Sequence, residues 1–310
     1  MRQFIKSFFL FFIFTFIVYV LLICIWGSFA PSLLRKNLNY ELGAYGHMFS
    51  RIKEIKETEN VDILFLGSSH TYRGFDTRVF ELNGFTSFNL GSSAQSPLQT
   101  EVLLKRHLAK LSPKLIVYEV YPGTFSSDGV ESSLDIIAND INDFESFKMA
   151  MKQNNVKVWN AYIYSLYREI FNKNSDFEEA AVKGEDTYIK GGYVEKKLKY
   201  FKYKNHEKNK WEFEPSQFDA FERTLAIIMD KKIKTIFVQA PITTLKYQAY
   251  TNNDDFDKKM RVFGDYYNFN ELMHLNDSLN FYDEHHLNII GVEIFNDKLS
   301  NIISAQLNKN

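Results

Sequence analysis

The sequence of 310 residues lacks the features that define several protein classes. Its one cysteine, Cys24, excludes a disulfide within the chain. The formal net charge of −1 argues against a general nucleic-acid-binding protein. The sequence has no internal repeat and no group of acidic or histidine residues with the spacing of metal ligands, so we expect neither a metal nor a cofactor. The length suits one large domain or two small ones.

An uncharged apolar run of 19 residues, Phe8 to Trp26, follows Arg2 and Lys6. As a helix this run would be about 28 Å long, close to the hydrocarbon thickness of a bilayer. We therefore predict an uncleaved membrane anchor over residues 8–27. The positive charges before the run favour an N-terminus inside the cell and a body outside the cell membrane.

Three alternatives apply to this N-terminal segment. A signal peptide would be cleaved after Ala30, but the apolar run exceeds the roughly 7–15 residues of a usual signal core, and Pro31 would follow the cut. A lipoprotein site at Cys24 would need a small preceding residue, and Ile23 is bulky. The last alternative is an intracellular globular protein with a hydrophobic tail.

A short apolar segment, Val61 to Leu66, is followed at once by Gly67, Ser68, Ser69 and His70. Such a segment is typical of a strand buried on both faces of a parallel sheet. Small residues at the carboxyl end of such a strand mark the place where open α/β sheets hold ligands. The free N–H groups of a following helix would favour negative charge there. We therefore predict that Ser69 is a catalytic nucleophile.

Strand-like and helix-like segments alternate along much of the chain, which predicts a parallel sheet covered by helices on both faces. The expected strands are residues 62–66, 86–90, 115–120, 235–239 and 279–282. The expected helices are residues 76–82, 97–111, 218–229, 256–269 and 287–307.

The predicted domain organisation follows from where this alternation is interrupted. The cytoplasmic N-terminus would be residues 1–7, the anchor 8–27, a juxtamembrane linker and helix 28–58, the sheet domain 59–125 together with 215–310, and a helical insertion or cap 126–214. Within the insertion we expect a loop over residues 183–192. Seven lysines between residues 196 and 210 are typical of a solvated face, and the alternative is a surface for an anionic polymer or lipid head groups.

A second group of chemically active side chains stands near the C-terminus. Serine needs a base to remove its proton, and that base needs a group that fixes its orientation. Asp283 and His286 are three residues apart, which can bring a carboxylate against an imidazole on a tight turn. We predict that His286 is the base for Ser69 and that Asp283 orients it.

Two other histidines are alternatives to His286. His70 is next to Ser69 and would have to fold back to act as its base, and His285 has the less suitable spacing from Asp283. We expect His70, His285 and Ser68 to line the site.

Taken together, Gly67-Ser68-Ser69, Gly91 after the second strand, and Asp283-x-x-His286 resemble the SGNH (GDSL-type) hydrolase superfamily. The resemblance covers about residues 60–125 and 215–307. It implies an α/β fold, a flavodoxin-like three-layer sandwich with a central parallel sheet. The G-S-S-H and D-x-x-H-L-N-x-x-G forms are similar to the membrane-anchored extracytoplasmic branch, with relatives of the teichoic acid D-alanyl transfer protein and of polysaccharide O-acetylation proteins.

The resemblance assigns the nucleophile, base and acid to Ser69, His286 and Asp283, and the oxyanion donors to the Ser69 amide and Gly91. The chain departs from the family at two places. Ser68 stands where the family often has aspartate, and the third strand ends in Tyr118-Glu119-Val120-Tyr121-Pro122, without the family's oxyanion asparagine. Such a donor is typically worth about 3–4 kcal/mol. Its absence implies either a substitute, for which Gln95 is the candidate, or a weaker or different reaction.

The resemblance and the anchor together imply a serine esterase or O-acyltransferase that acts on acyl esters, chiefly acetyl, of a cell-surface polysaccharide. A membrane-bound O-acyltransferase is the implied partner. Hydrolysis and transfer share one acyl-enzyme and differ in the acceptor that reaches it. The alternative function is a non-catalytic glycan-binding or assembly subunit, which the missing asparagine and the lysine-rich insertion favour.

Overall fold

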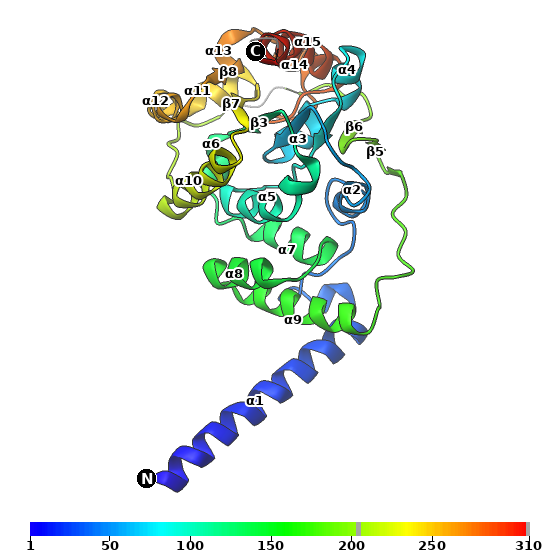
Figure 1. Cartoon of the computed structure of the whole chain (residues 1–310), viewed down its shortest axis with the longest axis vertical. Coiled ribbons are helices and arrows are strands. Elements are labelled where there is room, and N and C mark those ends of the chain that lie inside the picture. The colour runs from blue at the N-terminus through cyan, green and yellow to red at the C-terminus, as the bar shows by residue number, and fades with distance from the viewer. Residues whose placement is uncertain (203–205, 308–310) are drawn as a thin grey trace.

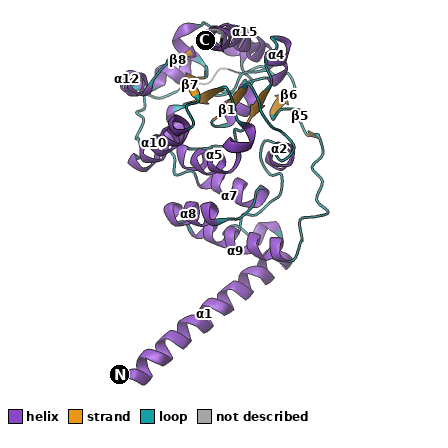
Figure 2. Cartoon of the chain, viewed as in Figure 1, coloured by secondary structure: helices purple, strands orange, loops and turns teal. Residues whose placement is uncertain are grey.

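The structure is a computed structural model that describes residues 1–202 and 206–307. A long N-terminal helix projects from an α/β body, and the C-terminal helix lies at the opposite end of that body (Figure 1). The strands of the body lie between helices on both sides (Figure 2).

The described part of the chain contains a five-stranded sheet in which all neighbouring strands are parallel. Its strands are β1 (Ile63–Leu66), β2 (Ser87–Asn89), β3 (Leu115–Glu119), β7 (Lys234–Gln239) and β8 (Tyr266–Asn268). Their order, β2-β1-β3-β7-β8, is the flavodoxin-like order of a doubly wound sheet. The predicted α/β fold with a central parallel sheet is therefore confirmed.

Alternation along β1 explains why its whole sequence is apolar. Successive side chains of a strand point to opposite faces of the sheet. Accordingly Leu64 and Leu66 belong to the core cluster on one face, whereas Ile63 and Phe65 belong to the cluster on the other face. The first cluster is completed by α2 (Met48–Ile55), α5 (Pro97–Leu111), α10 (Pro215–Asp230) and α12 (Asn253–Phe263), and the second by α4 (Thr77–Leu82) and α15 (Ile289–Leu307).

The N-terminal helix α1 (Arg2–Phe29) is packed on the body only near its end. There Ile23 is buried with Leu38, Tyr40 and Tyr164, the last of which belongs to α9 (Val156–Ile170). Within residues 1–202 and 206–307, α1 is the one helix long and apolar enough to cross a membrane, with a mean hydropathy of 3.1 over the window tested.

The first four strands lie within one residue of the predicted ranges, but the prediction for the fifth is wrong. Residues 279–282 were expected to form it; instead α14 (Asp277–Asn280) occupies the first half of this range, and the fifth strand is β8. The helix expected over residues 256–269 ends earlier because Gly264, with φ of 155°, terminates α12. The chain then has room for the three residues of β8.

The segment between β3 and α10 contains both helices and strands. Its helices are α6 (Pro122–Phe125), α7 (Val130–Asn139), α8 (Phe144–Gln153) and α9. The prediction of a loop over residues 183–192 is wrong. A small antiparallel sheet lies there instead, formed by β4 (Val182–Lys183), β5 (Asp186–Ile189) and β6 (Tyr193–Lys196). Part of the lysine-rich run forms ion pairs next to this sheet: Lys196 and Lys199 both contact Glu185, which lies in the turn between β4 and β5.

The remaining elements are short and connect the layers. They are the 3-10 helix η1 (Ser32–Leu34), α3 (Ser69–Gly74), α11 (Thr244–Ala249) and α13 (Phe269–Leu272). Among them, α3 begins at the carboxyl end of β1 and therefore positions the predicted nucleophile, Ser69.

Candidate active site

The turn after β1 is closely packed and places Ser69 at the first position of α3. Gly67 has φ of 138°, and a Cβ atom there would lie 2.4 Å from Thr71 Oγ1 and 2.8 Å from Glu119 O. Ser68 is the N-cap of α3, and its Oγ accepts a hydrogen bond from the His70 amide. A side chain at position 67 would therefore displace the turn that carries Ser69.

The structure brings the predicted nucleophile, base and acid together. His286 Nε2 lies 2.8 Å from Ser69 Oγ. On the other side of the ring, His286 Nδ1 lies 3.0 Å from Asp283 Oδ1 and 2.9 Å from Asp283 Oδ2. This arrangement lets the imidazole accept the serine proton at Nε2 while the carboxylate holds the proton on Nδ1.

Asp283 is fixed by its own backbone turn. Its Oδ1 accepts hydrogen bonds from the amides of His285 at 2.8 Å and His286 at 2.7 Å. Burial opposes ionisation, but the hydrogen bonds from His286 and these amides lower the pKa of Asp283 to about 2. Asp283 therefore carries its negative charge throughout the physiological pH range.

The His286 ring packs against two other rings. The Tyr282 ring is stacked on it at 5.5 Å between centroids, and the His70 ring lies at 5.1 Å. Both neighbours restrict rotation of the imidazole, so Nε2 stays directed at Ser69.

The structure places His70, His285 and Ser68 along the cavity at Ser69, as predicted. His285 Nδ1 lies 3.2 Å from Tyr121 Oη, and burial together with the neighbouring His286 lowers the pKa of His285 to about 4. Burial likewise lowers the pKa of His70, with His286 and His285 contributing. In the described part of the chain, only His286 makes a hydrogen bond to Ser69 Oγ. The geometry therefore favours His286 as the base over these two alternatives.

A buried carboxyl group below the turn was missed at the sequence level. Ser68 donates to Glu119 Oε2 from its Oγ at 3.0 Å and from its amide at 3.3 Å. Ser68 Oγ also lies 3.1 Å from His70 Nδ1, which links Glu119 to His70 through Ser68. Burial raises the pKa of Glu119 to about 8, so this group is largely protonated at neutral pH. The only sequence signal was a glutamate at the carboxyl end of a buried strand.

Two of the predicted oxyanion donors make hydrogen bonds to other groups of the protein. The Gly91 amide donates to Asn89 Oδ1 at 3.1 Å, so it is engaged within its own turn. Gln95 is buried, its Nε2 donates to Thr100 Oγ1 at 2.9 Å, and it does not line the cavity. The Ser69 amide has no acceptor among the described residues and remains the candidate donor.

The cavity at Ser69 has a volume of about 310 Å³. One side is formed by Ser93 and Ala94 from the turn after β2; Ala94 has a positive φ of 49°. Other lining residues that sequence reasoning missed follow β3: Tyr121, Gly123, Thr124, Ser127 and Glu131. The cavity is thus bounded mainly by hydroxyl-bearing and histidine side chains.

Searches for similar proteins found resemblance only to solved structures. No protein-family model and no curated protein matches the chain. One similar structure is a proposed acylhydrolase from Bacteroides fragilis NCTC 9343, with a TM-score of 0.42 and 13% identity over 83% of this chain and 95% of that one. Another is a GDSL-like lipase from Bacteroides thetaiotaomicron VPI-5482, with a TM-score of 0.40 and 11% identity over 81% of this chain and 90% of that one.

Proposed function

We propose that this chain is a membrane-anchored serine esterase or O-acyltransferase that acts on acyl esters of an extracytoplasmic cell-surface polysaccharide. The observation that carries the proposal is the continuous contact of Ser69 Oγ, His286 and Asp283. A hydroxyl, an imidazole and an ionised carboxylate in this order activate serine for attack on an ester carbonyl.

The reaction follows from the positions of these groups. Ser69 Oγ attacks the carbonyl carbon while its proton moves to His286 Nε2, and Asp283 stabilises the resulting imidazolium. The Ser69 amide, at the start of α3, donates to the oxyanion. Collapse of the tetrahedral intermediate breaks the ester bond, and the leaving alkoxide takes the proton from His286. The acyl group then passes from Ser69 to water or to a sugar hydroxyl.

The surroundings of Ser69 support a small acyl group and a polar acceptor. The cavity of about 310 Å³ is lined by the hydroxyl groups of Ser93, Thr124 and Ser127 and by the carboxyl group of Glu131. Such groups can hydrogen-bond the hydroxyl groups of a sugar. An acetyl ester is the simplest substrate that fits, and the helix α1 would hold the enzyme beside a membrane-bound O-acyltransferase that supplies or receives the acyl group.

The alternative is a non-catalytic glycan-binding or assembly subunit that keeps the same fold. The occupied Gly91 amide and the inward position of Gln95 favour this alternative, because they leave the oxyanion with fewer donors than expected.

A fluorophosphonate probe on the full chain in detergent separates the two functions. The esterase or transferase reacts with the probe, and Ser69→Ala abolishes labelling. Ser93→Ala and Ser127→Ala are matched controls, since both serines line the same cavity and should leave labelling intact. A folded protein that the probe does not label would favour the binding subunit. Release of acetate from an acetylated oligosaccharide, with and without an acceptor sugar, then distinguishes hydrolysis from transfer.

A further inference from the structure

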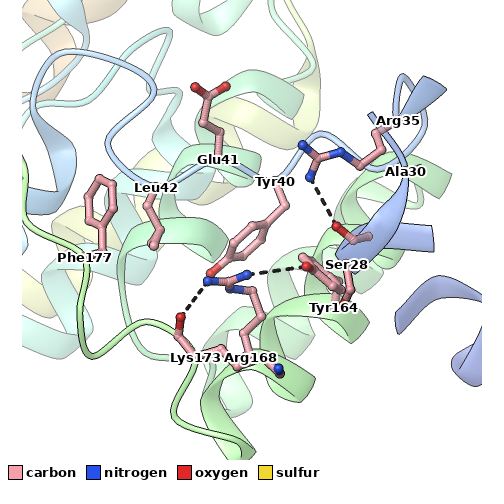
Figure 3. Close-up of a pocket in the computed structure, with 11 residues that line it drawn as sticks. Ser28, Ala30, Arg35, Tyr40, Glu41, Leu42, Tyr164, Arg168, Lys173 and Phe177 are labelled. Carbon is pink, nitrogen blue, oxygen red and sulfur yellow. Dashed lines mark hydrogen bonds between the residues drawn. The ribbon is translucent and has the colours of Figure 1, made fainter. Parts of the chain in front are cut away.

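A second cavity, of about 640 Å³, lies where α1 meets the body (Figure 3). It shares no lining residue with the cavity at Ser69. Three segments line it. Gly27 and Ser28 come from the end of α1, Arg35 and Tyr40 from the link to the sheet domain, and Arg168 and Lys173 from the end of α9 and the turn after it.

The cavity is rich in cationic groups. Arg35, Arg168 and Lys173 line it together with a single acid, Glu41. In Figure 3 the carboxylate of Glu41 is directed away from the guanidinium of Arg168. The net positive charge of the lining favours an anionic ligand.

The Arg168 guanidinium is held in place within this cavity. It donates to Tyr164 Oη at 3.4 Å, Lys173 O at 2.7 Å and Asn174 Oδ1 at 2.6 Å. It also lies over the Tyr40 ring, 5.5 Å from the centroid. A guanidinium has five N–H groups, so donors remain after these bonds, and their planar fork suits the oxygens of a phosphate.

Arg35 also lines the cavity and directly follows η1, in the link after α1. It donates from Nη1 to Gly27 O at 3.3 Å, while its buried Nε has no hydrogen-bond partner among the described residues. The guanidinium has further N–H groups besides these, so Arg35 keeps donors for an anion in the cavity that it lines.

The cavity lies at the level where a membrane-crossing α1 would leave the hydrocarbon. The apolar run ends at Trp26, and the next two residues, Gly27 and Ser28, already line the cavity. A run of this length spans about 28 Å, so the phosphates of one leaflet would lie beside these residues.

Exposed apolar side chains surround this end of the body. Close to the cavity in sequence are Phe29, Leu33, Leu34, Ile170 and Phe171, all at least 63% exposed. Phe144 and Met151 of α8 are also exposed, and α8 and α9 lie at the end of the body from which α1 projects (Figure 1). Large apolar side chains gathered at one end of a molecule are typical of a membrane-facing surface.

We infer that this cavity binds the phosphate-bearing head group of an anionic phospholipid from the membrane that α1 crosses. Arg35 and Arg168 would donate to the phosphate oxygens, with Lys173 adding positive charge, and the acyl chains would run along α1. A bound lipid would fix the orientation of the body above the membrane. The inference rests on α1 as a membrane-crossing helix and not on the reaction at Ser69.

The test measures lipid retention by the full chain in detergent micelles, using native mass spectrometry. Wild-type protein should retain phosphatidylglycerol in preference to phosphatidylcholine. The double variant Arg35→Gln/Lys173→Gln should weaken phosphatidylglycerol binding by roughly tenfold or more, as the loss of charge-assisted contacts predicts. Lys36→Gln/Lys157→Gln is the matched control: both side chains are exposed, neither lines the cavity, and the charge change is the same.

The remaining outcomes overturn the inference. Equal losses in the two double variants would mean that general positive charge attracts the lipid. Unchanged binding by Arg35→Gln/Lys173→Gln would mean that the cavity takes no lipid phosphate, and displacement of the lipid by millimolar inorganic phosphate would mean a site for the free ion. The single variant Lys173→Gln changes an exposed side chain and tests the same point if the double variant does not fold.

Discussion

His286 Nε2 lies 2.8 Å from Ser69 Oγ, although 217 positions separate the two residues in the chain. Ser69 is placed by the carboxyl end of β1, and His286 is placed by the turn that Asp283 closes before α15. The turn of Asp283 follows α14 and not a strand of the sheet, and the bridge between Phe281 and Leu287 closes its base. The contact therefore depends on how the C-terminal segment folds back to the carboxyl end of β1, where Ser69 lies.

Asp283→Asn should lower the rate of fluorophosphonate labelling by roughly 10³- to 10⁴-fold. The two backbone amides bonded to Oδ1 require an acceptor, so the amide oxygen of the variant side chain would take that position. Its NH₂ group would then lie where Oδ2 is now, 2.9 Å from His286 Nδ1, and would donate to it. The imidazole proton would move to Nε2, which could no longer accept the proton of Ser69.

The control for this variant is Asp254→Asn, the same chemical change on an exposed side chain of α12. It should label at the wild-type rate. Labelling of Asp283→Asn within a factor of about three of the wild-type rate, in protein with an unchanged melting temperature, would contradict the assigned role of Asp283.

Gly91→Ala should slow labelling and destabilise the protein even though the Gly91 amide does not face the cavity. A Cβ atom at this position would lie 2.8 Å from Ser68 O and 2.9 Å from Thr71 Cβ, so the turn that carries Ser69 would have to move. Overpacking of this kind costs about 1–3 kcal/mol. The measurements are the free energy of unfolding and the labelling rate.

Gly84→Ala is the matched control for Gly91→Ala. Gly84 has φ of 82° and no atom within 4 Å of the added Cβ, so the substitution strains only its own backbone, by about 1–2 kcal/mol. Its labelling rate should equal that of the wild type. If both variants label normally, Gly91 does not support the position of Ser69.

The sequence was sufficient to predict four strands of the sheet and the three side chains that the structure brings into contact at Ser69. Strands buried on both faces are apolar at every position, and β1, with Ile63 and Leu64 on opposite faces, shows this pattern. Ser69, Asp283 and His286 could be recognised because small or polar residues directly follow such strands or form a tight turn. These signals are local, and each can be read from a few neighbouring residues.

The features that the sequence did not predict depend on contacts between segments. The strand β8 is a three-residue edge strand with Asn268 at its end, too short and too polar for a pattern to indicate. Glu119 contacts Ser68 because β3 pairs with β1 in the sheet. The order of the strands in a sheet depends on contacts between distant segments and could not be predicted from the residues of either strand. The Gly91 amide donates a hydrogen bond to the side chain of Asn89. Residue spacing does not predict this hydrogen bond.

Glu119→Gln should reduce the loss of stability that the wild-type protein shows between about pH 5 and pH 8. Burial raises the pKa of Glu119 in the folded protein from 4.5 to about 8. Between these values the folded state holds a proton that the unfolded state has released, so the free energy of unfolding falls as the pH rises. This contribution is fully present below pH 4.5 and is lost once the pH exceeds about 8. The amide has the same shape, can still accept from Ser68, and does not titrate.

Asp135 is the internal control for this experiment, because burial also raises its pKa, to about 8. Asp135→Asn alone should flatten the same part of the stability profile, and the double variant should flatten it further. Asp283 does not interfere: its pKa is lowered to about 2, so its stabilising contribution is present above its ordinary pKa of 3.8 and is lost only as the pH falls through about 2. Melting temperatures measured at half-unit steps from pH 5 to pH 9 give the slopes. An unchanged slope in Glu119→Gln would show that the carboxyl group that accepts from Ser68 is ionised in the folded protein, and the buried link from Glu119 to His70 would then carry a negative charge.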